Sequence, residues 1–313
     1  MAEPSRAGLV ALIGRPNAGK STLMNALVGS KVAIVSPKPQ TTRNRIVGIL
    51  TRDRGQAVFF DLPGVHRPLH RMNARMMQEV RGSLEEVDLV LHMIDASQPW
   101  GRGEEYLFEL LEPVKVPVIG VLNKIDLVRP RERLLPLMDR YRERRPSTEV
   151  VPVSALTGEG LGELEDALFS ALPEGEPFYP PDLTTTQTER FFVAEVVREK
   201  LLHATRDELP YTTGVLVESF EEDEDLLRVE AVIYVERPSQ KAIVIGKGGR
   251  TIRRIGQAAR EELEALLGIR MYLGLRVKVH RRWREDPRLL AEMAPGVAAI
   301  GPLPGEEGTG GDE

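Results

Sequence analysis

The feature that most constrains this chain is the run G-R-P-N-A-G-K-S-T at residues 14–22, which lies between a strand-like and a helical stretch. Apolar residues 9–13 precede it, and helix-forming residues 23–27 follow it. In this setting a G-x-x-x-x-G-K-[ST] run forms a loop whose backbone N–H groups surround phosphate oxygens. Gly14 and Gly19 permit the backbone conformations that such a loop needs, and the start of the helix adds the positive end of its dipole. The sequence therefore predicts a site for a nucleoside triphosphate.

Two side chains of this loop have specific predicted roles. Lys20 is expected to reach the β- and γ-phosphates, and the Ser21 hydroxyl is expected to ligate Mg²⁺. Small and polar residues make up the rest of the predicted contact set. The loop residues assigned to nucleotide contact are Gly14, Asn17, Ala18, Gly19, Lys20, Ser21 and Thr22.

Composition excludes several kinds of chemistry. The 313 residues suggest two domains of ~150 residues each, and 42% hydrophobic and 28% charged residues are ordinary for folded cores. The chain has no cysteine, which excludes disulfides, thiolate metal sites and cysteine nucleophiles. It shows neither a basic and apolar leader nor an apolar run near the ~18 residues of a membrane span, so we expect a cytoplasmic protein.

Strand-like and helical segments alternate from residue 8 to about residue 172. Such alternation predicts an α/β domain in which helices cover both faces of a mostly parallel sheet. Ligands of such sheets bind beyond the carboxyl ends of the strands. The strand candidates are Leu9–Ile13, Arg45–Thr51, Ala57–Phe60, Leu89–Ile94, Val116–Leu122 and Val150–Val153.

Three further motifs follow strand candidates. D-L-P-G at residues 61–64 supplies a carboxylate that can hold Mg²⁺ through water and a glycine amide that can contact a γ-phosphate. N-K-I-D at residues 123–126 and S-A-L at residues 154–156 follow two later strands. The residues of these motifs assigned to nucleotide contact are Asp61, Leu62, Pro63, Gly64, Asn123, Lys124, Asp126, Ser154, Ala155 and Leu156.

The N-K-I-D motif identifies the base as guanine. The Asp126 carboxylate can accept hydrogen bonds from N1–H and from the exocyclic amine of guanine, whereas adenine has an acceptor at N1 and no such amine. A polar site of this kind discriminates by ~10⁴ or more. Asn123 is expected to brace the base loop, the stem of Lys124 to cover the base, and a backbone N–H of the S-A-L segment to bond guanine O6.

In this order the motifs resemble the translation-factor-like GTPases of the P-loop class. The resemblance implies that residues 37–43 form a switch in which a threonine completes the Mg²⁺ shell while the γ-phosphate is present. We expect this threonine to be Thr42, with Thr41 as the alternative. The expected metal shell is Ser21, Thr42 and Asp61, and the residues expected to carry catalysis are Lys20, Thr42 and Gly64.

One position departs from Ras-like GTPases, in which a glutamine after D-x-x-G orients the attacking water. That position is Val65 in this chain, so we expect slow intrinsic turnover. The chain resembles instead the GTPases with a hydrophobic residue in place of the glutamine. In several of these an asparagine at the position of Asn17 helps to hold K⁺ near the phosphates, which makes Asn17 a candidate K⁺ ligand.

A Pro-rich segment at residues 173–185 is expected to be a semi-rigid linker between a first domain, residues 1–172, and a second domain, residues 186–294. The second domain is expected to contain a helix, two strands, two helices that flank G-K-G-G at residues 246–249, and a last strand. This order resembles the type II KH domain, an α+β fold whose G-x-x-G loop clamps about four nucleotides.

The charge distribution favours nucleic acid as the ligand of this second domain. Residues 241–284 hold twelve Lys and Arg against three acids, whereas residues 218–230 hold seven acids and one Arg. A charge run alone is more often a solvated face, but this basic run coincides with the G-x-x-G loop. The RNA-binding candidates are Gly246, Lys247, Gly248, Gly249, Arg250, Lys278, His280 and Arg282, with the last three on the strand face opposite Val277 and Val279.

Together the two domains resemble the Era family over roughly residues 7–293. The resemblance implies a GTP-bound form that binds small-subunit (16S) ribosomal RNA near its 3′ end and assists assembly of the 30S subunit, with GTP, GDP and Mg²⁺ as ligands. It implies a cytoplasmic monomer, and some relatives are said to associate peripherally with the cytoplasmic face of the cell membrane. The tail at residues 295–313 is rich in Gly and acids, and we expect it to be disordered.

Two other functions stay open at this point. One is a constitutive RNA-binding protein in which the nucleotide is only structural. The other is a tRNA-modifying GTPase, which is disfavoured because the chain has no second cofactor motif and no cysteine.

Overall fold

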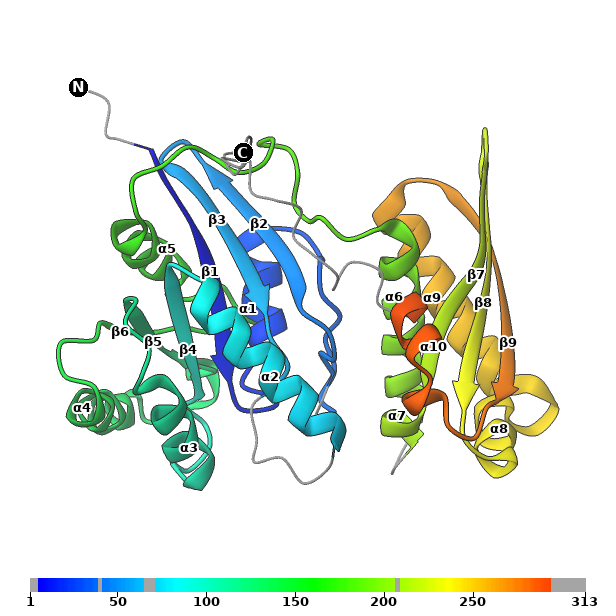
Figure 1. Ribbon diagram of the computed structural model, residues 1–313, viewed down its shortest axis with the longest axis horizontal. Coiled ribbons are helices and arrows are strands. Elements are labelled where there is room, and N and C mark those ends of the chain that lie inside the picture. The colour runs from blue at the N-terminus through cyan, green and yellow to red at the C-terminus, as the bar shows by residue number, and fades with distance from the viewer. Residues whose placement is uncertain (1–4, 39–40, 65–70, 206–208, 294–313) are drawn as a thin grey trace, which may run out of the picture. The chain divides into compact units, whose positions relative to one another are not determined.

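The computed structural model describes residues 5–38, 41–64, 71–205 and 209–293. The chain divides between Thr186 and Gln187 into two compact units, each with a sheet of its own (Figure 1). The Pro-rich segment at residues 173–185 belongs to the first unit. Nowhere in the described ranges does a helix reach the length and apolar character needed to cross a membrane.

The first unit is built on a six-stranded sheet with the order β2-β3-β1-β4-β5-β6. Every pairing is parallel except that of β2 with β3, so the predicted mostly parallel α/β sheet is confirmed. The strands are β1 (Arg6–Gly14), β2 (Ile46–Arg52), β3 (Gly55–Asp61), β4 (Leu89–Asp95), β5 (Val118–Asn123) and β6 (Val150–Pro152).

Helices cover this sheet, with α1 and α2 on opposite faces (Figure 1). The strands are apolar on both sides because both faces are covered, and residues Val10 to Ile13 of β1 are fully buried. The helices are α1 (Lys20–Val28), α2 (Arg71–Glu86), α3 (Arg102–Leu111), α4 (Leu134–Arg144) and α5 (Leu161–Ala171), with 3₁₀ turns at Ile125–Leu127 and Arg131–Arg133.

The second unit has a three-stranded sheet of β7 (Gly214–Asp223), β8 (Leu226–Val235) and β9 (Arg270–Val279). β7 and β8 are antiparallel, and β8 and β9 are parallel. The predicted order of one helix, two strands, two helices and one strand is confirmed, and two short helices that the sequence did not indicate, α7 and α10, are added. The helices are α6 (Glu189–Ala204), α7 (Leu209–Thr212), α8 (Pro238–Ile245), α9 (Arg250–Leu267) and α10 (Pro287–Met293), with 3₁₀ turns at Lys247–Gly249 and Trp283–Glu285.

The two faces of the second sheet are covered differently. Helices α6 and α9 pack on one face, where Val229 and Ile233 of β8 are buried with Val193 and Ile255 of the helices. On the other face, the C-terminal segment packs Trp283 and Leu289 against Val232 and Tyr234. Trp283 is buried and its indole N–H donates to the Thr212 carbonyl at 2.9 Å, so it acts in packing.

Candidate nucleotide and RNA sites

The phosphate loop connects the end of β1 to the start of α1, which is where the sequence placed it. Gly19 immediately precedes α1 with φ of 99°, a left-handed conformation that favours glycine. A Cβ on Gly19 would lie 2.2 Å from Nδ2 of Asn123, so side-chain space is absent as well. The loop is therefore shaped by glycine in the way a phosphate-binding loop requires.

Lys20 is buried beneath this loop with weak partners. Its Nζ lies 3.4 Å from the Gly14 carbonyl and 3.5 Å from the Arg15 carbonyl, both at the long limit of hydrogen bonding. Burial lowers the pKa of Lys20, and the nearby charge of Asp61 opposes that shift. A buried ammonium with such long contacts is costly unless an anion approaches it, so the residue fits the predicted role of binding phosphate.

Ser21, Thr42 and Asp61 meet at one point. The Ser21 hydroxyl donates to Oδ2 of Asp61 at 2.5 Å, and the Thr42 hydroxyl donates to the same oxygen at 3.0 Å. The two hydroxyl oxygens lie 3.1 Å apart. Thr41 points elsewhere, donating to the Lys38 carbonyl at 2.7 Å. The geometry thus brings Thr42, rather than Thr41, to the expected metal shell.

Asp61 is a fully buried carboxylate that hydroxyls satisfy at one oxygen only. Burial raises the pKa of its carboxyl, while the charge of Lys20 and the hydroxyls of Ser21 and Thr42 lower it. Its Oδ1 is buried and has no hydrogen-bond partner among the described residues. A buried carboxylate oxygen beside two hydroxyl oxygens is the hard oxygen set that Mg²⁺ prefers, so these residues fit a magnesium ion.

The guanine loops are braced by Asn123. Its Nδ2 donates to the Ala18 carbonyl at 2.8 Å, and its Oδ1 accepts from the Ala155 backbone N–H at 3.0 Å. One buried side chain therefore ties the phosphate loop to the S-A-L loop, as its predicted bracing role requires. Oδ1 of Asp126 accepts from the Ser154 hydroxyl at 2.7 Å, which orients this carboxylate.

Lys124 and Leu156 belong to the two loops that are expected to hold the base. Nζ of Lys124 lies 2.6 Å from Oδ2 of Asp95, and this ion pair fixes the lysine stem. Leu156 is 80% exposed, an unusual exposure for a large apolar side chain. Sequence reasoning did not single out Asp95, although it ends β4 as Asn123 ends β5, and this strand-end position was a usable signal.

The remaining predicted contacts surround the loop. A Cβ on Gly64 would lie 2.8 Å from Cα of Pro16, so the D-L-P-G segment packs against the phosphate loop, with Leu62 buried beside it. Thr22 lies half-buried in the first turn of α1. Val65 lies outside the described residues.

Asn17 links the phosphate loop to the switch segment. It has φ of 65°, is exposed, and its Nδ2 donates to the Pro37 carbonyl at 2.9 Å. Asn25, a residue that sequence reasoning missed, holds the chain shortly before the switch segment, at residues 32 and 33. Asn25 accepts from the N–H groups of Val32 and Ala33 at 3.0 and 2.9 Å and donates to the Ala33 carbonyl at 2.8 Å.

The G-x-x-G loop of the second unit joins α8 to α9. Gly246, Gly248 and Gly249 have φ of 71°, 62° and 75°. Nothing lies within 4 Å of a Cβ built on Gly248 or Gly249, so a polymer backbone can approach this turn. Lys247 and Arg250 are exposed beside it, as a phosphate-binding role requires.

Two further features lie on the helices that flank this loop. Ile243, on α8, is 53% exposed close to the loop in sequence and offers apolar surface to a base. Arg253, Arg254 and Arg260 are exposed on α9, which continues the basic surface away from the glycines. Their helical spacing was readable in the sequence, but their exposure was not.

The other three RNA-binding candidates, Lys278, His280 and Arg282, have side-chain partners outside the G-x-x-G loop. Nζ of Lys278 is 5.9 Å from the ring centroid of Tyr234, on the sheet face covered by the C-terminal segment. Nε2 of His280 lies 3.6 Å from Oδ2 of Asp286, and Nε of Arg282 lies 3.9 Å from Oε2 of Glu285. Lys278 lies on the sheet face opposite α9, as predicted, but β9 ends at Val279, so the prediction that His280 and Arg282 share this strand face is wrong. The role of the three residues in RNA binding stays a prediction.

Comparison with known protein families agrees with this division into two sites. A model of the 50S ribosome-binding GTPase family matches residues 9–124, and a model of the KH domain matches residues 208–284. The first match includes the phosphate loop and the D-L-P-G motif, and the second includes the G-x-x-G loop.

Two solved structures are similar to the chain over almost its whole length. A variant of Aquifex aeolicus Era bound to GDP and AlF₄⁻ is 40% identical, covers 94% of this chain and 100% of its own, and has a TM-score of 0.88. Era in complex with MgGDPNP and nucleotides 1506–1542 of 16S ribosomal RNA is 39% identical over the same shares, with a TM-score of 0.89. Identity of this order over both units shows that the chain belongs to the Era family of GTPases.

Proposed function

We propose that this chain is a GTP-hydrolysing switch that binds small-subunit ribosomal RNA near its 3′ end and assists assembly of the 30S subunit. The observation that carries the proposal is that one chain combines a braced guanine-nucleotide site with an open G-x-x-G loop. The relative crystallised with nucleotides 1506–1542 of 16S ribosomal RNA supports this RNA as the target. We place the protein in the cytoplasm, where ribosomal subunits are assembled.

In this proposal each group has a part in hydrolysis. Lys20 neutralises charge that develops on the β- and γ-phosphate oxygens as the terminal bond breaks. Ser21, Thr42 and Asp61 would hold Mg²⁺, which supplies further neutralisation of phosphate charge when bound. The Gly64 amide, against the phosphate loop, would contact the γ-phosphate and register its loss.

We propose slow intrinsic turnover, because Val65 has no group that could orient the attacking water. The K⁺ proposal rests on Oδ1 of Asn17 as the ligand, because Nδ2 of the same amide donates to the Pro37 carbonyl at 2.9 Å and an N–H donor cannot ligate the ion. Turnover is then expected to fall when K⁺ is replaced by Na⁺ at constant ionic strength, and to become indifferent to this exchange in Asn17→Ala. Equal wild-type rates in the two salts would remove K⁺ from the mechanism.

The switch is tested by measuring affinity for the RNA of nucleotides 1506–1542 with a non-hydrolysable GTP analogue and with GDP. We expect tighter binding with the analogue, because the nucleotide must favour the RNA-competent state to act as a switch. Equal affinities would instead favour a constitutive RNA-binding protein with a structural nucleotide.

Lys247→Ala is the matched test of the G-x-x-G loop, with Lys115→Ala as a control at an exposed position of the first unit. The first variant is expected to weaken RNA binding in both nucleotide states, and the control is expected to leave it unchanged. Recovery of unrelated RNA after crosslinking the GTP-bound protein in cells would contradict the assigned target.

A further inference from the structure

Residues 173–186, called here the strap, connect α5 to the segment that leads into α6. The strap does not behave as a free linker, because it is hydrogen-bonded along its length to strands of the first unit. The Ala7 N–H donates to the Pro173 carbonyl at 3.1 Å, and the Gly175 N–H donates to the Ser5 carbonyl at 3.0 Å. These bonds fasten the start of the strap beside β1.

Gln56 fastens the middle of the strap. Its Oε1 accepts from the Tyr179 N–H and its Nε2 donates to the Tyr179 carbonyl, both at 2.9 Å. Nε2 also donates to the Thr51 hydroxyl at 2.9 Å, and the side chain is fully buried. A buried amide that satisfies both backbone groups of one strap residue holds that residue as a neighbouring strand would.

The end of the strap is bonded to β2, the edge strand of the sheet. The Ile49 N–H donates to the Thr184 carbonyl at 2.8 Å, and the Thr185 hydroxyl donates to the Val47 carbonyl at 2.7 Å. An edge strand presents unpaired backbone groups, and the strap occupies them at these two residues. Only a few residues separate Thr185 from the start of α6, which is part of the core of the second unit.

Two of the three residues of the expected metal shell, Thr42 and Asp61, lie at the open end of the β2–β3 hairpin, and the third, Ser21, lies on α1. Thr42 stands four residues before β2, and Asp61 ends β3 directly opposite Ile46. The strand that the strap holds is therefore continuous with the threonine that should engage or release Mg²⁺. Four residues of chain separate Thr42 from Val47.

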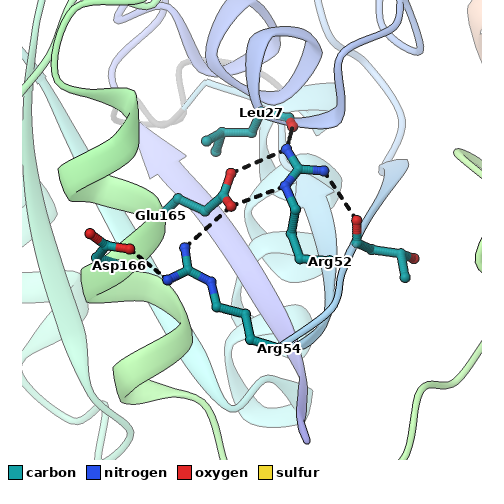
Figure 2. A network of polar contacts seen from close by, with 6 residues as sticks. Leu27, Arg52, Arg54, Glu165 and Asp166 are labelled. Carbon is teal, nitrogen blue, oxygen red and sulfur yellow. Dashed lines mark hydrogen bonds and ion pairs between the residues drawn. The ribbon is translucent and has the colours of Figure 1, made fainter.

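The closed end of this hairpin is anchored elsewhere (Figure 2). Arg52 binds Glu165 of α5 at 3.0 and 3.2 Å and the carbonyl of Leu27, at the end of α1, at 3.3 Å. Arg54 binds Glu165 at 3.2 Å and Asp166 at 2.5 Å. Because the turn is tied to α5 by two arginines, displacement of the open end is not relieved by a slide of the whole hairpin.

From this arrangement we infer that the strap is the conformational relay between the nucleotide and the second unit, through its bonds to Gln56 and to the outer edge of β2. The inference rests on the proposed switch function and assigns it a route. With GTP, Thr42 is held at the metal and the strap stays paired with β2. After hydrolysis Thr42 is released, the open end of the hairpin loosens, and the strap pairing weakens.

The test is the ratio of RNA affinities, GTP analogue over GDP, for the fragment of nucleotides 1506–1542 in wild type, Gln56→Leu and Thr185→Val. Both variants are expected to bring the ratio toward one, while nucleotide affinity without RNA stays near wild type. Thr148→Val, at a half-buried loop position before β6, is the matched control and is expected to keep the wild-type ratio. Wild-type ratios in Gln56→Leu and Thr185→Val would overturn the relay while leaving the switch intact, whereas a ratio of one in wild type would overturn both.

Hydrogen exchange gives a second readout that needs no variant. The Ile49 amide is protected by the strap carbonyl, so we expect it to exchange faster in the GDP-bound than in the analogue-bound full chain. The Gly120 amide, bonded to the Glu149 carbonyl at 2.8 Å at the opposite side of the sheet, should exchange equally in both. Equal protection of Ile49 in both states would contradict the relay even if Gln56→Leu failed to fold.

Discussion

The nucleotide site and the G-x-x-G loop differ in how deeply their charged and polar side chains are buried. In the first unit, Lys20, Asp61 and Asn123 are each at most 6% exposed, and the last two are held by hydrogen bonds. In the second unit, Lys247 is exposed beside Gly248 and Gly249, which have open space around them, and Arg253 is exposed on the helix that follows. The nucleotide site is buried and preorganised, whereas the G-x-x-G loop and the helix after it form an accessible charged surface.

The difference teaches how each site should gain affinity. A buried, preorganised site selects a ligand by leaving its own polar groups unpaired when the wrong ligand enters. An exposed basic surface gains affinity from counterion release and is sensitive to salt. Substitutions in the first unit should therefore have large and specific effects, and those in the second should have graded ones.

The largest effect is expected at Asp126. Asn in its place keeps one acceptor but presents a donor to a guanine edge that also donates, so Asp126→Asn should reduce affinity for GDP by ~10⁴. Titration with a fluorescent GDP analogue measures this loss, and an unchanged circular dichroism spectrum controls for folding. A loss below tenfold would show that the carboxylate is not the source of base selection.

A smaller effect on turnover separates two adjacent threonines. Thr42→Val removes the hydroxyl that meets Ser21 and Asp61 and should slow GTP hydrolysis by ~10²-fold, similar to the loss of one contact to developing charge. Thr41→Val removes a bond to the Lys38 carbonyl and should leave the rate within a few-fold of wild type. Phosphate release under single-turnover conditions compares the two variants. Equal reductions of the hydrolysis rate would show that Thr42 contributes no more than Thr41.

The first unit also buries a histidine, His92, in β4. His92 is fully buried, its Nδ1 lies 2.9 Å from the Tyr141 hydroxyl, and burial lowers its pKa to about 3, with the charge of Arg145 adding to the shift. An unfolded histidine takes up a proton below about pH 6.5, whereas the folded one does not until about pH 3. Its contribution to the free energy of unfolding is therefore full above pH 6.5 and is lost as the pH falls toward 3.

This loss should approach ~1.4 kcal/mol per pH unit, a tenfold change in the folding equilibrium. His92→Gln keeps a neutral hydrogen-bonding side chain and should flatten the profile by that slope. Urea unfolding of both proteins between pH 6.5 and pH 4.5 provides the comparison, in which carboxylate contributions are shared. Parallel profiles would mean that the imidazole accepts a proton in the folded unit.

One topological rule let the sequence predict which residues gather at one edge of the first sheet. Parallel strands end at the same edge of a sheet, so residues that follow strands, such as Asp61 and Asn123, had to gather there. Thr42 could not be separated from Thr41 in this way, because neighbouring loop residues have no periodicity. In the structure the Thr42 hydroxyl contacts Ser21 and Asp61 and the Thr41 hydroxyl does not, and no local signal in the sequence carried that information.

The second unit shows the other limit of pattern reasoning. Alternation correctly grouped Val277 and Val279 toward the helices, where both pack against the core. It could not show that the C-terminal segment covers the Tyr234 side of the sheet, beside Lys278 and His280. The pairing of the Pro-rich strap with β2 could not be predicted from the sequence either, because it depends on which strand forms the edge of the sheet.

The smallest expected effect tests the exposed side of the comparison. Single-stranded RNA binding should lose ~0.7 of its logarithmic salt slope for each phosphate contact removed, so Lys247→Ala and Arg253→Ala should each reduce the slope by about that amount. Between two salt concentrations fourfold apart, this corresponds to a change of only about 2.6-fold. Fluorescence anisotropy with the RNA of nucleotides 1506–1542 measures the slope, and GDP affinity in the same buffers serves as the internal control.

Because the nucleotide site is buried and internally braced, removal of either cation should leave its salt dependence unchanged. If the salt slopes of GDP affinity and RNA affinity changed equally, the same surface charges would govern both sites, and the distinction between a buried and an exposed site would be wrong.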